Sequence, residues 1–100
     1  MSIPNWNALL PSIEQIEAMP PEKLAAADAF TESSVKTIGF GIAAIGNLLA
    51  GAALNEDQGL DPAAVADLGW LLQSLGDLSA KLTDTGYGIQ ERRQAIKRED

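Results

Sequence analysis

Carboxylates in pairs are the side chains of this sequence that could do chemistry, acting as a general acid and a general base. Glu14 and Glu17 are spaced to share one face of a helix, and so are Asp77 and Asp84. Carboxylates at such spacings, however, usually belong to a solvated surface. The chain contains no cysteine and no histidine, the commonest general base. Its serines therefore have no histidine to activate them as nucleophiles.

Motifs that would hold a cofactor or a metal are also missing from the sequence. It has no P-loop, no dinucleotide-binding fingerprint and no metal-ligand cluster. Residues 86–88, Gly-Tyr-Gly, resemble a glycine-rich loop but are more typical of a turn. We therefore predict that the protein is not an enzyme and uses neither a cofactor nor a metal.

The net charge of −7 is unevenly distributed along the chain. Residues 1–84 carry eleven acids and three bases, whereas residues 85–100 carry three acids and four bases. An acidic body repels phosphate backbones, so we predict no direct nucleic-acid contact and attraction to a basic protein surface. A simpler interpretation is that the acids only keep the protein soluble. The basic cluster, Arg92, Arg93, Lys97 and Arg98, is most typical of cations that complement a helix dipole, and a weak contact with nucleic acid or an acidic patch is the alternative.

Periodicity and capping signals predict a single all-α domain spanning residues 1–100. Ser12 and Gln15 form a capping-box signal before a short helix, and Pro20 ends that helix. From Pro21 onward, apolar residues recur in steps of three and four. The Thr-Glu-Ser-Ser run at 31–34 predicts a break that leaves one helix of about ten residues and another of about twenty.

A second long helix is predicted from Asp61 followed by Pro62, a restart signal after a loop at 55–60. Residues 83–88 predict the end of its leucine-rich face, although the steps of three and four could also continue through Ile89 to Ile96. Residues 85–100 are a basic tail, either a separate short helix or frayed. No segment alternates with a period of two, so we predict a compact antiparallel bundle of about four to five helices.

Small residues form a stripe on each of the two main helices. One stripe includes Gly39 and Gly46, and the other includes Gly69 and Gly76. A mid-helix glycine costs up to about 1 kcal/mol relative to alanine, so several in register indicate close helix–helix approach. We expect the stripes to pack the two helices against each other within one chain. Self-association through one stripe is the alternative.

Two aromatic residues, Trp70 and Phe40, lie opposite the apolar stripes of their predicted helices. We expect the chain to cover them with its opening segment, around Trp6, or with its C-terminal residues. If Trp70 is exposed instead, it is an interface anchor, because tryptophan is enriched among binding hot spots. The partner-binding residues predicted on this basis are Asp67, Trp70 and Asp77, followed by Glu56, Asp57 and Asp61.

Residues 37–54 carry no charge, which raises the question of a transmembrane helix. Four glycines, an asparagine and the lack of a basic flank argue against membrane insertion. The opening residues also predict no signal peptide. We therefore expect a cytoplasmic protein that does not enter a membrane.

Two stretches, SIPNWNALLPSIEQIEAMPPEKLAAADAF and DPAAVADLGWLLQSLGDLSAKLTDTG, give the chain the character of short phage-encoded accessory proteins. In size, acidity and lack of catalytic residues it is similar to small anti-CRISPR proteins, particularly inhibitors of type I surveillance complexes. The resemblance implies a protein of the host cytoplasm that occupies the basic surfaces with which a Cas complex grips DNA and blocks target binding. Anti-CRISPR proteins share no single fold, so no site residue is taken from them. The alternative function is a homodimeric helical-bundle structural or regulatory protein.

Overall fold

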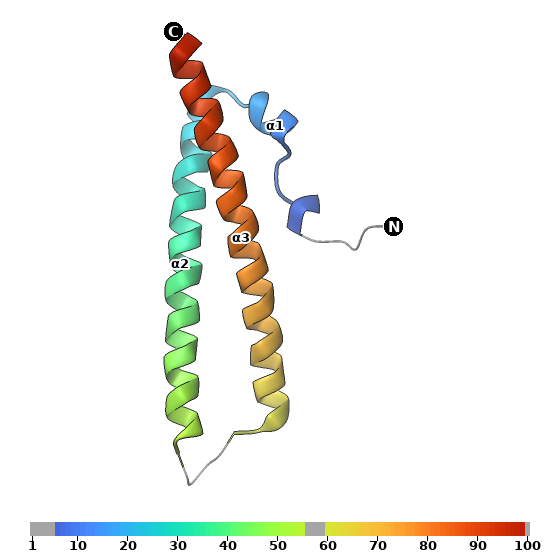
Figure 1. The fold of residues 1–100 in the computed structure, drawn as a ribbon, viewed down its shortest axis with the longest axis vertical. Helices are drawn as coiled ribbons and strands as arrows, with labels where there is room; N and C mark the ends of the chain where they lie inside the picture. Colours follow the sequence, from blue (N-terminus) through green and yellow to red (C-terminus); the bar gives the residue numbers. More distant parts are fainter. Residues whose placement is uncertain (1–5, 56–59, 100) are drawn as a thin grey trace.

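The computed structural model describes residues 6–55 and 60–99, whose regular secondary structure is entirely helical (Figure 1). Two long helices, α2 (Pro21–Ala53) and α3 (Pro62–Glu99), lie side by side as an antiparallel hairpin. A 3-10 turn, η1 (Trp6–Ala8), and the short α1 (Ile13–Glu17) precede them. The all-α prediction is confirmed for the described residues, but a hairpin stands in place of the expected four-to-five-helix bundle.

Capping signals set the helix starts as predicted. Ser12 Oγ accepts a hydrogen bond from the Gln15 N–H at 3.2 Å, and Gln15 Oε1 accepts one from the Ser12 N–H at 2.8 Å. Pro21 opens α2, where a backbone N–H would have no helical partner. The Ala63 N–H donates to Asp61 Oδ1 at 3.3 Å, so Asp61 caps the start of α3.

Helix α2 continues through residues 31–34, where the sequence predicted a break. Thr31 Oγ1 donates to the Ala27 carbonyl at 2.7 Å, so the hydroxyl is satisfied within the helix. Glu32 and Lys36 form an i,i+4 ion pair at 3.3 Å on the exposed side. Thr31 is buried against α3. Tertiary packing therefore outweighs the weak helix propensity of this stretch.

Helix α3 also continues through its predicted end at residues 83–88, and the basic tail forms its last turns. Gly86 is buried, and a Cβ added to it would lie 3.2 Å from Thr31 Cγ2. This glycine therefore permits close approach of the two helices and does not mark a turn. Thr83 Oγ1 donates to the Ser79 carbonyl at 2.9 Å, which satisfies a second hydroxyl within α3.

A seam of side chains with the 3.5-residue period of a coiled coil joins α2 to α3. Between residues 36 and 54 of α2, every side chain that is not exposed belongs to this seam. From residue 35 to residue 82, no described residue of the seam is fully buried. The seam consists of Leu24, Asp28, Thr31, Val35, Ile38, Ile42, Ile45, Leu49 and Ala52 on α2, and of Leu68, Leu72, Leu75, Ser79, Leu82, Gly86, Ile89, Arg93 and Ile96 on α3.

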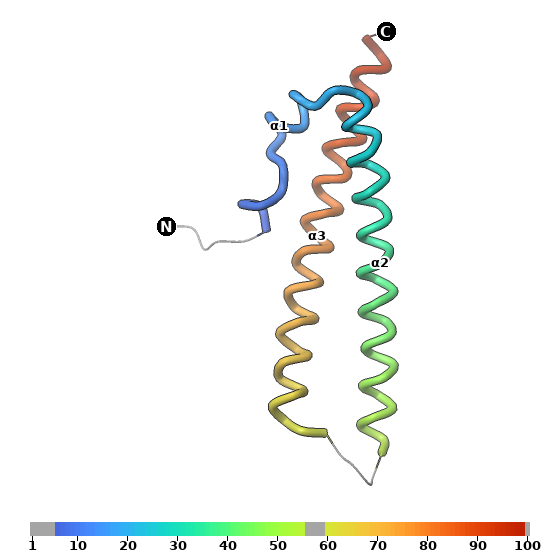
Figure 2. The backbone as a smooth tube through the Cα atoms, turned by 180° about the vertical axis from the view of Figure 1, so that it is seen from behind, coloured from blue at the N-terminus to red at the C-terminus, as the bar shows by residue number. Residues whose placement is uncertain are grey.

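The buried core lies at the end of the hairpin where α1 meets the start of α2 and the end of α3 (Figure 2). Leu24 and Ile89 are 0% and 1% exposed, and Ile16 of α1 is 4% exposed. We call this the closed end, and we call the half of the hairpin beyond Val35 and before Leu82 the loop end. The residues packed around the core are Met19, Ala27 and Ile96.

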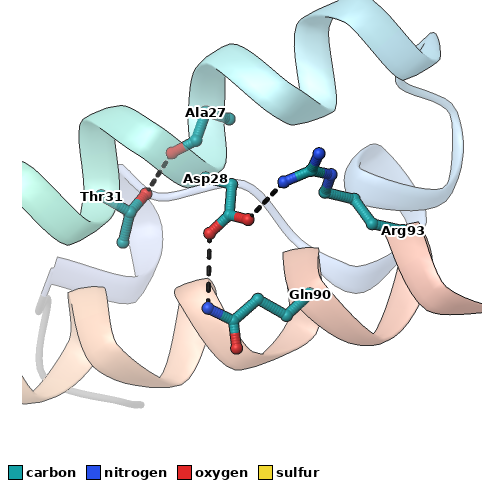
Figure 3. Close-up of polar contacts among 5 residues, drawn as sticks. All are labelled: Ala27, Asp28, Thr31, Gln90 and Arg93. Carbon is teal, nitrogen blue, oxygen red and sulfur yellow. Dashed lines mark hydrogen bonds and ion pairs between the residues drawn. The ribbon is translucent and has the colours of Figure 1, made fainter.

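An ion pair crosses the hairpin at the closed end (Figure 3). Arg93 Nη1 lies 2.6 Å from Asp28 Oδ2, and Gln90 Nε2 donates to Asp28 Oδ1 at 3.4 Å. Asp28 and Arg93 both occupy seam positions, where a polar pair can fix the register of two helices. The sequence did not indicate this contact, because its partners lie 65 residues apart.

We expect Asp28→Asn to lower the free energy of unfolding by about 1 kcal/mol, because it weakens a partly buried, charge-assisted hydrogen bond. Urea denaturation measures the change. The matched control is Glu32→Gln, which breaks the exposed Glu32–Lys36 pair and should change stability by no more than about 0.5 kcal/mol. Equal losses for the two variants would contradict the role given to the Asp28–Arg93 pair.

Candidate protein-binding site

A row of polar side chains with one tryptophan follows the side of α3 that faces away from α2. We call it the acidic edge, and it comprises Asp67, Trp70, Ser74, Asp77 and Asp84. These residues are spaced by three and four positions, apart from the step over Lys81, and all five are exposed. The row is displaced two positions from the seam, which is about 200° around a helix of 3.6 residues per turn. The structure therefore places the three first-ranked predicted residues on one open surface.

Trp70 and Phe40 are not covered by the chain, contrary to expectation. Their side chains are 70% and 76% exposed. The opening segment packs elsewhere: α1 and η1 contact α3, and Ile16 Cδ1 lies 3.5 Å from where a Cβ on Gly88 would be. The C-terminal residues continue α3 in a straight line and so cannot fold back over either aromatic ring. The interpretation of Trp70 as an exposed side chain therefore holds, and the expectation of intramolecular cover is wrong.

The second-ranked predicted residues are less well placed. Asp61 is exposed, but one of its carboxylate oxygens accepts the hydrogen bond that caps α3. Glu56 and Asp57 lie outside the described residues. The acidic edge is therefore the part of the predicted site that the structure brings together.

The basic cluster near the C-terminus is divided among three environments. Arg93 pairs with Asp28 across the seam. Arg92 lines a cleft of about 240 Å³ beneath α1, where its Nε is buried without a hydrogen-bond partner. Lys97 and Arg98 are exposed in the last turn of α3, where cations stabilise the helix dipole. A continuous basic patch is therefore not formed by these residues.

The glycines of the two small-residue stripes do not pack the helices together. A Cβ built on Gly39, Gly46, Gly69 or Gly76 would meet no atom within 4 Å. The stripes are therefore open to solvent, and the helices meet through the larger seam residues instead. The stripes consist of Gly39, Ala43, Gly46, Ala50 and Ala53 on α2 and of Ala66, Gly69, Gly76 and Ala80 on α3.

The loop end of the hairpin is apolar as well as open. Helix α2 contains an 18-residue window that is long and apolar enough to cross a membrane, and none of that window is buried. Large apolar side chains at this end are exposed, including Leu48 and Leu71. A helix that is apolar on all sides is normally enclosed by protein or lipid. Within residues 6–55 and 60–99, nothing encloses the loop end of α2 in this way.

Within the described residues, no three side chains of histidine, cysteine, aspartate or glutamate gather closely enough to hold a metal ion. The hollows of the surface are shallow clefts between helices. One of about 590 Å³ is formed by the opening segment and the start of α2. Two surfaces of the described residues stay open, the acidic edge of α3 and the uncovered apolar loop end.

Comparison with known proteins identifies no relative, because no protein family, curated protein or solved structure matches this chain.

Proposed function

We propose that this chain is a non-catalytic protein that binds a protein partner through the acidic edge of α3. The observation that supports this proposal is the exposure of Trp70 in a row with Asp67 and Asp77. A tryptophan that is 70% exposed gains from burial against a partner, and such residues are enriched among hot spots. The carboxylates on either side would form the polar rim that excludes water from it.

The partner chemistry that fits this edge is a basic surface that normally holds nucleic acid. Aspartates can form charge-assisted hydrogen bonds with the lysines and arginines that would otherwise contact phosphates. The net charge of −7 would also accelerate the encounter with such a surface. The chain would then act by occupation, since a bound protein and a DNA target compete for one site.

The resemblance to small anti-CRISPR proteins names one partner of this kind, a type I CRISPR-Cas surveillance complex in the cytoplasm of a phage-infected cell. On this proposal the protein blocks target DNA binding without cleaving or modifying anything. The proposal needs neither a metal nor a cofactor.

Binding to a purified type I surveillance complex tests the proposal directly. We expect co-elution that weakens as salt rises, because screening shortens the reach of exposed charges to about 10 Å at 0.1 M. Trp70→Ala should weaken binding by roughly 30-fold, which corresponds to about 2 kcal/mol for a hot spot. The double variant Asp67→Lys with Asp77→Lys should abolish the competition with target DNA.

The matched control changes the charge by the same amount away from the acidic edge, with Glu32→Lys and Glu99→Lys. It should bind with nearly wild-type affinity apart from a small general effect of net charge. If the edge variants and the control bind alike, or if no basic partner binds, the acidic edge has no role in recognition.

A further inference from the structure

The hairpin is a single layer of helices, only 14 Å thick along its shortest axis. Stable domains usually consist of at least two packed layers, because one face of each layer must be buried. In this chain the seam is only partly buried throughout the loop end, at Ile42, Ile45 and Leu49 of α2 and at Leu72 and Leu75 of α3. The loop end therefore has the residues of a core without the second layer that would complete it.

The two small-residue stripes lie on the same broad face of this layer. At the closed end, one groove of about 230 Å³ is lined by Glu32 and Lys36 of α2 and by Thr83 and Tyr87 of α3. On α2, Glu32 and Lys36 continue in steps of three and four into the stripe that begins at Gly39. On α3, Tyr87 and Thr83 continue in the same way into the stripe that contains Ala80 and Gly76. We call this surface the glycine face, and define it by the two stripes.

The glycine face carries no charge from residue 37 to residue 53 of α2 or from residue 62 to residue 80 of α3, and Gln73 is the one polar side chain in its α3 row. Residues 37–54 contain no charge, and the two charges within residues 62–80, Asp67 and Asp77, lie on the acidic edge. Because the glycines have no side chain, a packing partner could contact the partly buried seam residues beside them from this side. Another helix could therefore approach closely and bury the seam without stranding a charge.

We propose that a second copy of this chain packs on the glycine face, so that two hairpins form a four-helix bundle. The exposed area supports this occupant. The chain exposes 7596 Å², and a compact monomer of 10.5 kDa exposes about 5,400 Å². This excess of roughly 2,000 Å² is spread over the whole chain, and a standard interface needs only ~800 Å² per partner. A two-fold axis would bring the same uncharged surface from both copies together.

The positions of the other elements favour a second copy over two alternative occupants of the glycine face, the opening segment of the same chain and lipid. The opening segment is used elsewhere, since α1 lines a cleft with Gly88, Glu91 and Arg92 on another side of α3. A lipid bilayer around α2 would also surround the neighbouring part of α3. That part of α3 carries the exposed carboxylates of Asp67 and Asp77. Face-to-face packing buries the glycine face and leaves these carboxylates in water.

The dimer surface is separate from the acidic edge and does not depend on it. Trp70 follows Gly69 directly, so its side chain points about 100° away from the glycine face. Two-fold packing on the glycine face therefore leaves both acidic edges outward. A dimer would present two Trp70 sites to partners, which is a bivalent arrangement.

Light scattering over a range of concentrations tests the dimer with three variants. Wild-type protein should have the mass of two chains. Gly46→Leu and Gly76→Leu each place a bulky group on the glycine face, and the two-fold symmetry puts that group into the interface from both copies. Each variant should therefore raise the dimer Kd by roughly a hundredfold. Gly51→Leu is the control, because Gly51 lies on another side of α2 and is equally open.

Circular dichroism separates loss of the dimer from loss of the fold. Leucine is a better helix former than glycine, and both glycines have open space around them, so each variant monomer should stay helical. A wild-type monomer at all concentrations overturns the proposal, as does a dimer that Gly51→Leu disrupts as much as Gly46→Leu. Co-sedimentation with phospholipid vesicles in place of dimer formation would also overturn it and assign α2 to a membrane. None of these outcomes depends on whether a basic partner binds the acidic edge.

Discussion

Replacing Leu24 with alanine is expected to lower the free energy of unfolding by about 2–5 kcal/mol. Leu24 is fully buried, and the core around it contains two other buried apolar side chains, Ile16 and Ile89. Small domains are stable by only about 5–15 kcal/mol in total. Loss of this one side chain should therefore leave a substantial fraction of the protein unfolded at physiological temperature. Thermal and urea denaturation followed by circular dichroism measure the loss.

Leu48→Ala is the matched control for this prediction, because it removes the same atoms from the same helix. Leu48 is 75% exposed, so its truncation should change stability by less than about 0.5 kcal/mol. If the two variants lost similar stability, the closed end would not be the part of the hairpin that holds it together.

Gly86→Leu is expected to destabilise the protein by about 1–3 kcal/mol, even though leucine is the better helix former. A Cβ at this position already lies 3.2 Å from Thr31 Cγ2, so the rest of a leucine side chain would force α2 and α3 apart. Urea denaturation measures the loss. Gly51→Leu should do the opposite and stabilise the monomer by up to about 1 kcal/mol, because nothing lies within 4 Å of its Cβ position.

A second variant pair shows whether the contact with Thr31 is the cause. Thr31→Ser removes the methyl group and keeps the hydroxyl that bonds to Ala27. In that background Gly86→Ala should be more favourable than it is in the wild-type protein, because the added methyl fills the space left by Cγ2. Additive effects of the two substitutions would show that the residues do not limit each other's size.

The features that sequence predicted correctly depend on neighbouring residues. The capping box of Ser12 and Gln15, the start of α2 at Pro21 and the start of α3 after Asp61 are all present. Each depends on interactions within one turn of helix, which are side-chain hydrogen bonds at Ser12 and Asp61 and the fixed φ and missing N–H of Pro21. The helical period of the apolar residues also predicted the seam, because the same spacing recurs along both helices.

The features that sequence failed to predict depend on the other helix. The run at 31–34 is a poor helix former by itself, but Thr31 is buried beside α3 and its hydroxyl bonds to the Ala27 carbonyl within α2. Gly86 was predicted to belong to a turn for the same reason. Its role in letting the helices approach is evident only when α2 lies beside it. The small-residue stripes predicted contact between the helices. In the structure α2 and α3 face each other through the larger seam residues, and the stripes lie to one side of that contact.

The candidate site was predictable in part. The spacing of Asp67, Trp70 and Asp77 placed them on one side of a helix, and they are together on the acidic edge. Whether Trp70 is covered depends on where α1 and η1 dock, which no local pattern encodes. The Asp28–Arg93 pair was missed, although Asp28 and Arg93 are the two charged residues of the seam, and their opposite charges were the available signal.

The closed end joins the parts of the hairpin that are most distant along the chain. Asp28 and Arg93 are separated by 65 residues, and the buried core lies beside them. Contacts of this kind must overcome the entropy of closing about two thirds of the chain before they contribute any stability, which slows folding. We therefore expect the rate of folding to depend on how fast the two distant ends of the hairpin meet, more than on the connection between α2 and α3.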